Sequence, residues 1–481
     1  MDGRSAETGQ FERYLSAVAR GLDDWLDSDM PDATSSGIDW QERLKGPVPE
    51  RGVGAEATID EFIRTVLPNG PRLSSSKWWG WITTGPTTVP VVLSSAAMVA
   101  APQRYTLTAF NRLEELSLEW LAQVCSLGDH MKGVYSSGGS TANLVALGAA
   151  RQWAFEQVGI DASAGGYGGR DCAVYTSAEA HHTVQRSAGV LGIGRDNVRL
   201  IPTDLRQRMD VSKLRERLRR DREAGVVPVA IVAAAGTTNT GAIDPLRDVG
   251  ELAREFGAWF HVDGAYGLPG SLDERVAPLY EGLELADSAI VDPHKWLGAP
   301  VGVAATFVRD RSILHRAFTQ EPADYLEGAF TPDDVQVSLD DMGIPYADFG
   351  VELSSPSRGV MVWGILSEMG VEGLRRRVVS DNDFARHVAS RAHAHPSLEV
   401  LAEPVLSICG FRYTSGVDTD LDGVNAAILR RLVRETPIIV SSTIVNGSFV
   451  LRPCFINART TLADVDELVD TVVRLGAELT S

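Results

Sequence analysis

The chain has 481 residues, of which 44% are hydrophobic and 23% charged, close to the averages of globular proteins. Its 45 basic and 64 acidic residues give a net charge of −19, which argues against nonspecific binding to nucleic acid or to anionic membranes. No apolar run reaches the roughly 18 residues of a membrane-spanning helix, and residues 1–20 lack the apolar stretch of a secretory signal.

Cysteine usage points to a reducing compartment. The four cysteines lie far apart, with no CxxC or metal-ligand spacing, at Cys125, Cys172, Cys409 and Cys454. We therefore expect reduced thiols in a cytoplasmic protein and no metal site. The length suggests two or three structural units with ample buried core.

The first 75 residues predict a helical and irregular N-terminal segment, and an amphipathic helix is expected over residues 112–127. This helix leads into a glycine-rich stretch at 133–143. Strand-like runs then alternate with helical stretches such as 211–223 and 246–256. The expected strands are 172–176, 198–202, 227–235, 259–262, 288–292 and 304–308. This alternation predicts an α/β fold with a mostly parallel sheet covered on both faces, in a large domain over 76–370.

The pattern changes after about residue 355. A long helical stretch at 359–379 precedes a region that looks antiparallel, with expected strands at 398–405, 408–414, 438–443 and 448–453. The last helix is expected to start at Thr461, because Asp464 three residues later completes an N-cap pattern. This end predicts a smaller C-terminal α/β domain over 371–481.

Lys295 lies in the stretch VDPHKWLG, directly after the short apolar run 288–291. Such a run is typical of a buried strand that ends before Pro293. A lysine in a partly apolar, cation-rich site loses its proton more readily and can form a Schiff base with an aldehyde. The position of Lys295 at the mouth of a strand therefore indicates a catalytic residue.

Other polar residues also fall where expected strands end. Gly138–Thr141 precedes a helical run, so its backbone N–H groups and hydroxyls suit a phosphate, although a simple helix cap fits the same pattern. Asp263 ends a strand and needs a cationic partner such as a protonated ring nitrogen, or else caps a turn. His181 could stack on a flat ring or be a structural histidine, and Thr237 supplies further donors.

A phosphate cradle, a ring-stacking histidine, a carboxylate for a ring nitrogen and a lysine that forms an imine suit one cofactor. That combination is what pyridoxal 5′-phosphate (PLP) requires. In an open parallel sheet, ligands bind beyond the carboxyl ends of the strands, so these residues are expected to converge there.

The sequence also resembles the group II PLP-dependent amino acid decarboxylases, the family of aromatic amino acid, glutamate and histidine decarboxylases. The resemblance spans about Trp78 to the C-terminus and rests on six stretches in order. They are GVYSSGGSTANLVALGAAR, AEAHHTVQRSAGVLGIGRDNVRLIPTD, VAAAGTTNTGAIDPL, WFHVDGAYG, ADSAIVDPHKWLG and FVLRPCFINARTT. It implies the aminotransferase-like fold, fold type I, and a homodimer whose subunits share their active sites.

The resemblance also implies roles for individual residues. Lys295 would carry the cofactor as a Schiff base, and Asp263 would pair with its ring nitrogen. His181 would stack on one face of the ring and Ala265 would pack on the other. The residues expected to bind the phosphate or otherwise support the cofactor are Gly139, Ser140, Thr237 and His294.

Further positions would serve the substrate. Tyr325 matches a loop tyrosine that is thought to protonate the substrate carbon, and Arg452 matches an arginine near the substrate carboxylate. Trp81 lies in the region that helps build the substrate pocket, and Tyr105 lies where a partner subunit would complete it. The structural alternatives are a solvated loop position for Tyr325, an ion pair for Arg452 and core packing for Trp81.

The predicted reaction is decarboxylation of an L-amino acid, or of a related biosynthetic intermediate, to an amine and CO2. Some relatives instead let oxygen intercept the reaction and release an aldehyde, ammonia and peroxide, and they often replace the loop tyrosine or the stacking histidine. Both Tyr325 and His181 are present, which favours simple decarboxylation. Another PLP lyase, a transaminase or a non-catalytic scaffold fits the sequence less well.

Overall fold

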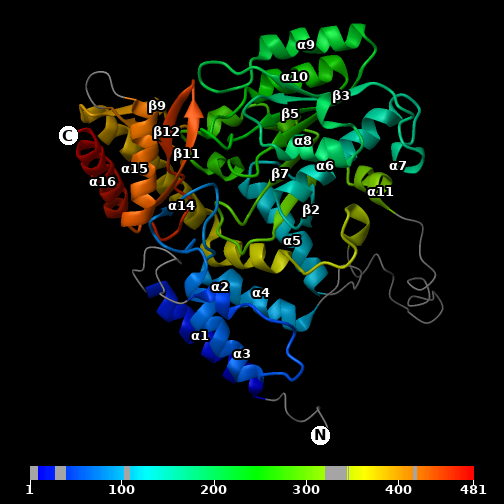
Figure 1. Ribbon diagram of the computed structural model, residues 1–481. Helices are drawn as coiled ribbons and strands as arrows, with labels where there is room; N and C mark the ends of the chain where they lie inside the picture. Colours follow the sequence, from blue (N-terminus) through cyan, green and yellow to red (C-terminus); the bar gives the residue numbers. More distant parts are fainter. Residues whose placement is uncertain (1–8, 28–38, 102–108, 320–343, 345, 415–419) are drawn as a thin grey trace, which may run out of the picture.

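A seven-stranded, mostly parallel sheet forms the centre of the larger part of the protein (Figure 1). The computed structural model describes residues 9–27, 39–101, 109–319, 344, 346–414 and 420–481. The strand order is β2-β8-β7-β6-β5-β3-β4, and β8 alone runs opposite to the other strands of this sheet, so its pairings with β2 and β7 are antiparallel. The strands are β2 (Lys132–Ser136), β3 (Cys172–Ser177), β4 (Val198–Ile201), β5 (Val227–Ala234), β6 (Trp259–Asp263), β7 (Ser288–Val291) and β8 (Ala304–Val308).

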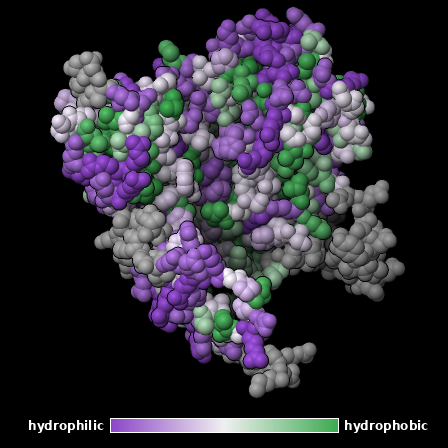
Figure 2. All heavy atoms as spheres, viewed as in Figure 1, coloured by the Kyte–Doolittle hydropathy of each residue, from purple (hydrophilic) through white to green (hydrophobic). Residues whose placement is uncertain are grey.

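Helices follow the parallel strands and cover the sheet, because the strands are apolar and almost wholly buried. They are α6 (Gly139–Glu156), α8 (Thr183–Val190), α9 (Val211–Glu223) and α10 (Leu246–Phe256). Helix α10 buries Val249, Leu252 and Phe256 at helical spacing and ends at Gly257, whose φ of 67° suits a left-handed cap. The polar exposed surface of α9 stands out at the top of the molecule (Figure 2).

A second, five-stranded sheet lies towards the C-terminus, in the order β1-β11-β12-β10-β9. Its strands are β1 (Trp78–Trp79), β9 (Leu398–Ala402), β10 (Gly410–Tyr413), β11 (Ile439–Val445) and β12 (Ser448–Arg452). The helices α15 (Leu421–Glu435) and α16 (Leu462–Thr480) accompany this sheet (Figure 1). Thr461 and Asp464 form the expected capping box at the start of α16.

The long helix α14 (Gly359–Ala394) connects the two parts and is kinked at Gly370, where φ is 59°. The remaining α-helices of the described residues precede the seven-stranded sheet in the chain or flank it. They are α1 (Gln10–Asp27), α2 (Trp40–Arg43), α3 (Ala55–Glu61), α4 (Thr88–Ala100), α5 (Ala109–Val124), α7 (Ala162–Gly165) and α11 (Ser312–Phe318). Helix α14 packs against α4 and α5.

The structure confirms the α/β class and the mostly parallel sheet. Two strands were not predicted: β2, which joins the large sheet at an edge, and β1, which pairs in parallel with β11. A strand of two residues carries too little periodicity to be recognised, and β1 is stabilised by the distant segment it pairs with. The domain ranges 1–75, 76–370 and 371–481 stay a prediction, although β1 joins residues of the second range to the C-terminal sheet.

Two observations bear on the cellular setting. All four cysteines are free and buried. Among the described residues, no helix combines the length and the apolar character that a membrane crossing needs. The cytoplasmic location stays a prediction.

Trp79 offers a test of how much the β1 contact stabilises the fold. Its side chain is fully buried, donates from Nε1 to Thr460 Oγ1 at 2.9 Å and packs against Phe455 at 5.4 Å between ring centroids. We expect Trp79→Ala to lower the free energy of unfolding by about 3–5 kcal/mol, because a large buried ring is lost. The matched Trp40→Ala removes a half-exposed ring and is expected to change it by about 0.5 kcal/mol or less. If chemical denaturation gave equal losses of unfolding free energy for the two variants, the proposed contribution of Trp79 and β1 to stability would be contradicted.

Candidate active site

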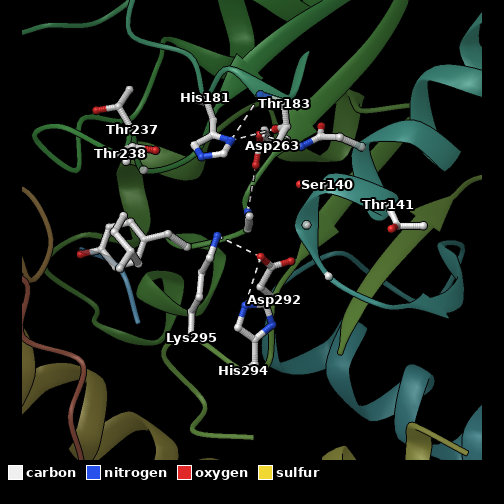
Figure 3. Close-up of a pocket in the computed structure, with 18 of the residues that line it drawn as sticks. Ser140, Thr141, His181, Thr183, Thr237, Thr238, Asp263, Asp292, His294 and Lys295 are labelled. Carbon is white, nitrogen blue, oxygen red and sulfur yellow. Dashed lines mark hydrogen bonds and ion pairs between the residues drawn. The ribbon is translucent and has the colours of Figure 1, made fainter. Parts of the chain in front are cut away.

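A cavity of about 470 Å³ opens where the parallel strands of the large sheet end (Figure 3). This volume falls within the roughly 300–1,000 Å³ of small-molecule sites. Its walls come from segments far apart in the sequence, which only the sheet brings together. Lining residues from strand ends and their loops include Ser140, His181, Thr237, Asp263, Asp292 and Lys295.

Lys295 enters the cavity from the turn after β7 and forms an ion pair with Asp292. Its Nζ lies 2.9 Å from Asp292 Oδ2, and the Asp292 side chain is only 2% exposed. His294 Nδ1 donates to the carbonyl of Val303 at 2.7 Å, which leaves Nε2 towards Asp292 at 3.8 Å. Figure 3 shows the lysine ammonium group between Asp292 on one side and Asp263 with His181 on the other.

Asp263 ends β6, the neighbour of β7 in the sheet. Its Oδ2 accepts a hydrogen bond from Asn143 Nδ2 at 3.1 Å, and its Oδ1 accepts one from the backbone N–H of Ala265 at 3.2 Å. These two donors stabilise a partly buried carboxylate without neutralising it. Asp263 can therefore pair with a cationic group in the cavity.

His181 follows β3 and lies on the same side of the cavity as Asp263. Its Nδ1 is 2.8 Å from Thr183 Oγ1, and its ring lies 4.2 Å from that of His182. Burial lowers the pKa of His181, and the Asp263 carboxylate opposes this effect. A neutral, flat imidazole suits stacking on an aromatic ring.

The N-terminus of α6 forms another wall. Gly138, with φ of 148°, precedes Gly139 and Ser140, which begin the helix and line the cavity. A Cβ on Gly139 would come within 2.6 Å of Asp292 Oδ2, so only glycine leaves this space open. The free N–H groups of the helix start and the helix dipole favour an anion here.

These residues fit PLP. The start of α6 and His294 would hold the phosphate, Asp263 the ring nitrogen, and Lys295 the aldehyde carbon. His181 and Ala265 would flank the ring, since both line the cavity and Ala265 is supported by an apolar cluster with Ala142 and Ile290. One buried atom, Asp292 Oδ1, has no hydrogen-bond partner among the described residues, so the cavity offers an acceptor to an incoming group.

The predicted cofactor residues thus lie around one cavity: Gly139, Ser140, His181, Thr237, Asp263, Ala265, His294 and Lys295. Within this set, the buried Thr237 hydroxyl accepts from the backbone N–H of Ala242 at 3.1 Å, so it also shapes its own loop. Their individual roles stay predictions. Tyr105 and Tyr325 lie outside the residues that the structure describes.

Two predicted substrate residues, Trp81 and Arg452, do not line this cavity among the described residues. Arg452 is only 3% exposed, and its guanidinium donates to the carbonyls of Trp81 at 2.9 Å and Asn239 at 3.1 Å, and also to that of Thr238. These contacts favour a structural tether between the two sheets. Trp81 has φ of 55°, uncommon for a bulky residue, and its ring is 64% exposed. A contact of either residue with substrate stays a prediction.

Sequence reasoning missed three residues of the site: Asp292, Asn143 and Thr183. Asp292 directly follows a buried strand, much as Asp263 ends one, and this similarity could have identified it. Asn143 and Thr183 lie within or beside recognised motifs, but their contacts with Asp263 and His181 depend on how α6 packs on the sheet.

Comparisons with known proteins agree with this site. The family described as "Pyridoxal-dependent decarboxylase conserved domain" matches residues 93–414. An aromatic-L-amino-acid decarboxylase of Bacillus atrophaeus is 30% identical over 77% of this chain and 74% of its own length. An L-2,4-diaminobutyrate decarboxylase of Rhizobium meliloti is 29% identical over 90% and 84%. The crystal structure of Oryza sativa TDC with PLP and tryptamine superposes with a TM-score of 0.90 at 25% identity, over 99% of this chain and all of the other.

Lys295→Ala tests the covalent attachment. The purified protein with PLP is expected to show a visible imine band that borohydride removes, and peptide mapping should then find the reduced cofactor on Lys295. Lys295→Ala should lack the band, whereas Lys213→Ala, a lysine on the exposed face of α9, should keep it. An unchanged band in Lys295→Ala would refute the assignment.

Proposed function

The chain belongs to the pyridoxal-dependent decarboxylase family, and from this membership we propose that it converts an L-amino acid to the corresponding amine and CO2 with Lys295 as its covalent anchor for PLP. It is a PLP-dependent amino acid decarboxylase, a carboxy-lyase. The observation that carries the proposal is the convergence of Lys295, Asp263 and His181 with the start of α6 on one cavity.

When bound, PLP supplies an electron sink for the pair of electrons left behind as CO2 departs. The residues of this chain supply binding, orientation and charge. Asp263, held by the donors from Asn143 and Ala265, keeps a negative charge where the ring nitrogen would lie. His181 and Ala265 would hold the ring between them, and the α6 N-terminus with His294 would hold its phosphate end.

Asp292 orients Lys295 in this proposal. It accepts the Lys295 ammonium at 2.9 Å and thereby keeps Nζ directed into the cavity. Tyr325 is proposed as the donor of the proton to the substrate carbon, as the family resemblance implies.

The substrate is proposed to be an L-amino acid. The relatives named above act on aromatic amino acids and on L-2,4-diaminobutyrate, so side chains of different chemistry are accepted within the family. Beside the polar residues, the cavity is lined by Ile82, Tyr266 and Val301, which offer apolar surface to a side chain. A substrate screen must therefore include both aromatic and charged amino acids.

A homodimer is proposed as the active form. The helix α4 exposes apolar side chains at Val92, Met98 and Val99, which are 59%, 70% and 64% exposed. Trp81 and Val301 are also mostly exposed, and Val301 lies at the cavity. Exposed apolar side chains gathered on one helix are typical of an interface, and a two-fold dimer is the commonest way to cover them. Residues of the partner subunit would then close the cavity.

One screen tests the reaction. Amino acids incubated with the PLP-loaded protein are expected to release CO2 without consuming oxygen, and the amine should accumulate in equal amount. Stoichiometric oxygen uptake with peroxide and aldehyde would instead support the oxidative alternative. The Lys295→Ala variant serves as the control for nonenzymatic release by free PLP.

The interface can be tested by charge insertion. The wild-type protein is expected at about twice the 51.8 kDa of the chain in light scattering. The double variant Met98→Glu/Val99→Glu should shift it to the monomer mass, because burying the two carboxylates at an interface is costly. The matched Val190→Glu/Leu205→Glu changes apolar residues that are also exposed, at 68% and 92%, and should leave the mass unchanged. A dimer in both variants would place the interface elsewhere.

A further inference from the structure

Asn143 is a buried amide at the centre of a branched hydrogen-bond network. It lies on α6 with 1% of its surface exposed. Its Nδ2 donates to Asp263 Oδ2 at 3.1 Å and to Thr183 Oγ1 at 3.2 Å. On its other side, Oδ1 lies 3.1 Å from His261 Nε2. The side chain therefore connects the two residues that face the cofactor site with the core of the sheet.

The chain of hydrogen bonds behind Asn143 can run in one direction only. A carboxylate accepts, so Asn143 must turn its NH2 group to Asp263 and its Oδ1 to His261. His261 Nε2 must then carry a proton. Burial lowers the pKa of His261 to about 4, so the ring is neutral at pH 7 and its Nδ1 is bare.

Ser288 and Trp259 continue the same series of hydrogen bonds, with each donor pointing towards Asn143. Ser288 Oγ lies 2.8 Å from the bare His261 Nδ1 and must donate its hydroxyl proton to it. Trp259 Nε1, which can only donate, lies 2.7 Å from Ser288 Oγ and supplies the hydrogen bond that this oxygen accepts. His261 and Ser288 are fully buried and Trp259 is 5% exposed, so water does not compete for these hydrogen bonds.

The second branch reaches His181. Thr183 Oγ1 accepts from Asn143 and lies 2.8 Å from His181 Nδ1, and the backbone N–H of Thr183, which can only donate, points to the same nitrogen at 3.4 Å. His181 Nδ1 is therefore the acceptor, and the Thr183 hydroxyl donates to it. In neutral His181 the proton then resides on Nε2. One orientation of the Asn143 amide thus supplies the donor to Asp263 and a donor to Thr183 Oγ1, in agreement with the His181 tautomer that the Thr183 N–H requires.

We propose that the buried series Trp259–Ser288–His261–Asn143 is a positioning device, which holds the Asn143 amide in the orientation that lets it donate both to Asp263 and to Thr183, the residue that contacts His181 Nδ1. This inference rests on the proposed function, because Asp263 and His181 matter through the cofactor. His261 is thereby a positioning residue whose effect passes through Asn143. If His261 were only a packed core residue, its replacement would alter stability and leave the cofactor unaffected.

A matched pair of substitutions separates these outcomes. His261→Gln keeps a donor that can reach Asn143 Oδ1, whereas His261→Leu removes it at similar size. Without the donor, Asn143 Oδ1 is left buried and unpaired, so the amide is held less firmly and its hydrogen bond to Asp263 weakens. Asp263 is then more basic and would take a larger share of the proton between it and the ring nitrogen, and a less positive ring leaves the imine nitrogen more basic. We therefore expect the pH midpoint of the cofactor's visible absorption change to rise by about one unit in His261→Leu and to stay at the wild-type value in His261→Gln.

Thr176→Val is the control for general damage to the sheet. The Thr176 hydroxyl is buried in β3 and donates to the carbonyl of Val232 at 3.0 Å, outside the proposed series. Thr176→Val should lower stability and leave the midpoint unchanged. All of these variants retain the titratable side chains that line the cavity around Asp263, namely His181, Tyr266, Asp292, His294 and Lys295. An unshifted midpoint in His261→Leu, or equal shifts in Leu and Gln or in Thr176→Val, would overturn the proposal.

A second measurement does not depend on the cofactor or on the variants. Nitrogen-15 NMR of histidine-labelled apoprotein at pH 7 is expected to show His261 neutral, with the proton on Nε2 and a bare Nδ1. A proton on Nδ1, or a doubly protonated ring, would overturn the series even if PLP binding and decarboxylation are established. Conversely, failure to bind PLP would refute the proposed function, while this NMR result would still decide the donor-to-acceptor direction of the hydrogen bonds in the series.

Discussion

The structure depends on the cost of placing two carboxylates at the ends of adjacent buried strands. Asp263 ends β6 and Asp292 directly follows β7, next to it in the sheet. A carboxylate removed from water requires a cation or several donors. Each aspartate meets this requirement differently: Asp263 accepts neutral donors and keeps its charge available to the cavity, whereas Asp292 is paired with the Lys295 ammonium.

This difference divides the cavity into two electrostatic halves. One half joins an available carboxylate to a neutral imidazole, His181, and suits the ring of the cofactor. The other joins the α6 N-terminus, His294 and the Lys295–Asp292 pair, and suits the phosphate and the aldehyde. The parallel sheet creates both halves at once, because it brings the carboxyl ends of its strands to one edge.

The second sheet supports this edge from outside the cavity. Arg452 on β12 donates to a carbonyl of the loop after β5 and to the carbonyl of Trp81. The backbone N–H of Trp81 donates to Ser441 Oγ, so both backbone polar groups of this residue, whose φ is positive, are bound by the second sheet. A buried guanidinium with several carbonyl acceptors ties the segments together and makes their separation costly. The C-terminal part therefore fixes the loop that contains Thr237 and Thr238, two residues that line the cavity.

The sequence by itself determined the fold class, most strands and helices, and the chemical types gathered at the strand ends. Local periodicity and the order of motifs contain this information, so the bounds of α9 and α10 agree with prediction. Only the tertiary structure decided which side chains contact one another. The Lys295–Asp292 pair, the tether of Arg452 and the series from Trp259 to Asn143 join residues whose partners are set by strand order and helix packing. Such contacts span up to several hundred residues of sequence, and no local pattern specifies them.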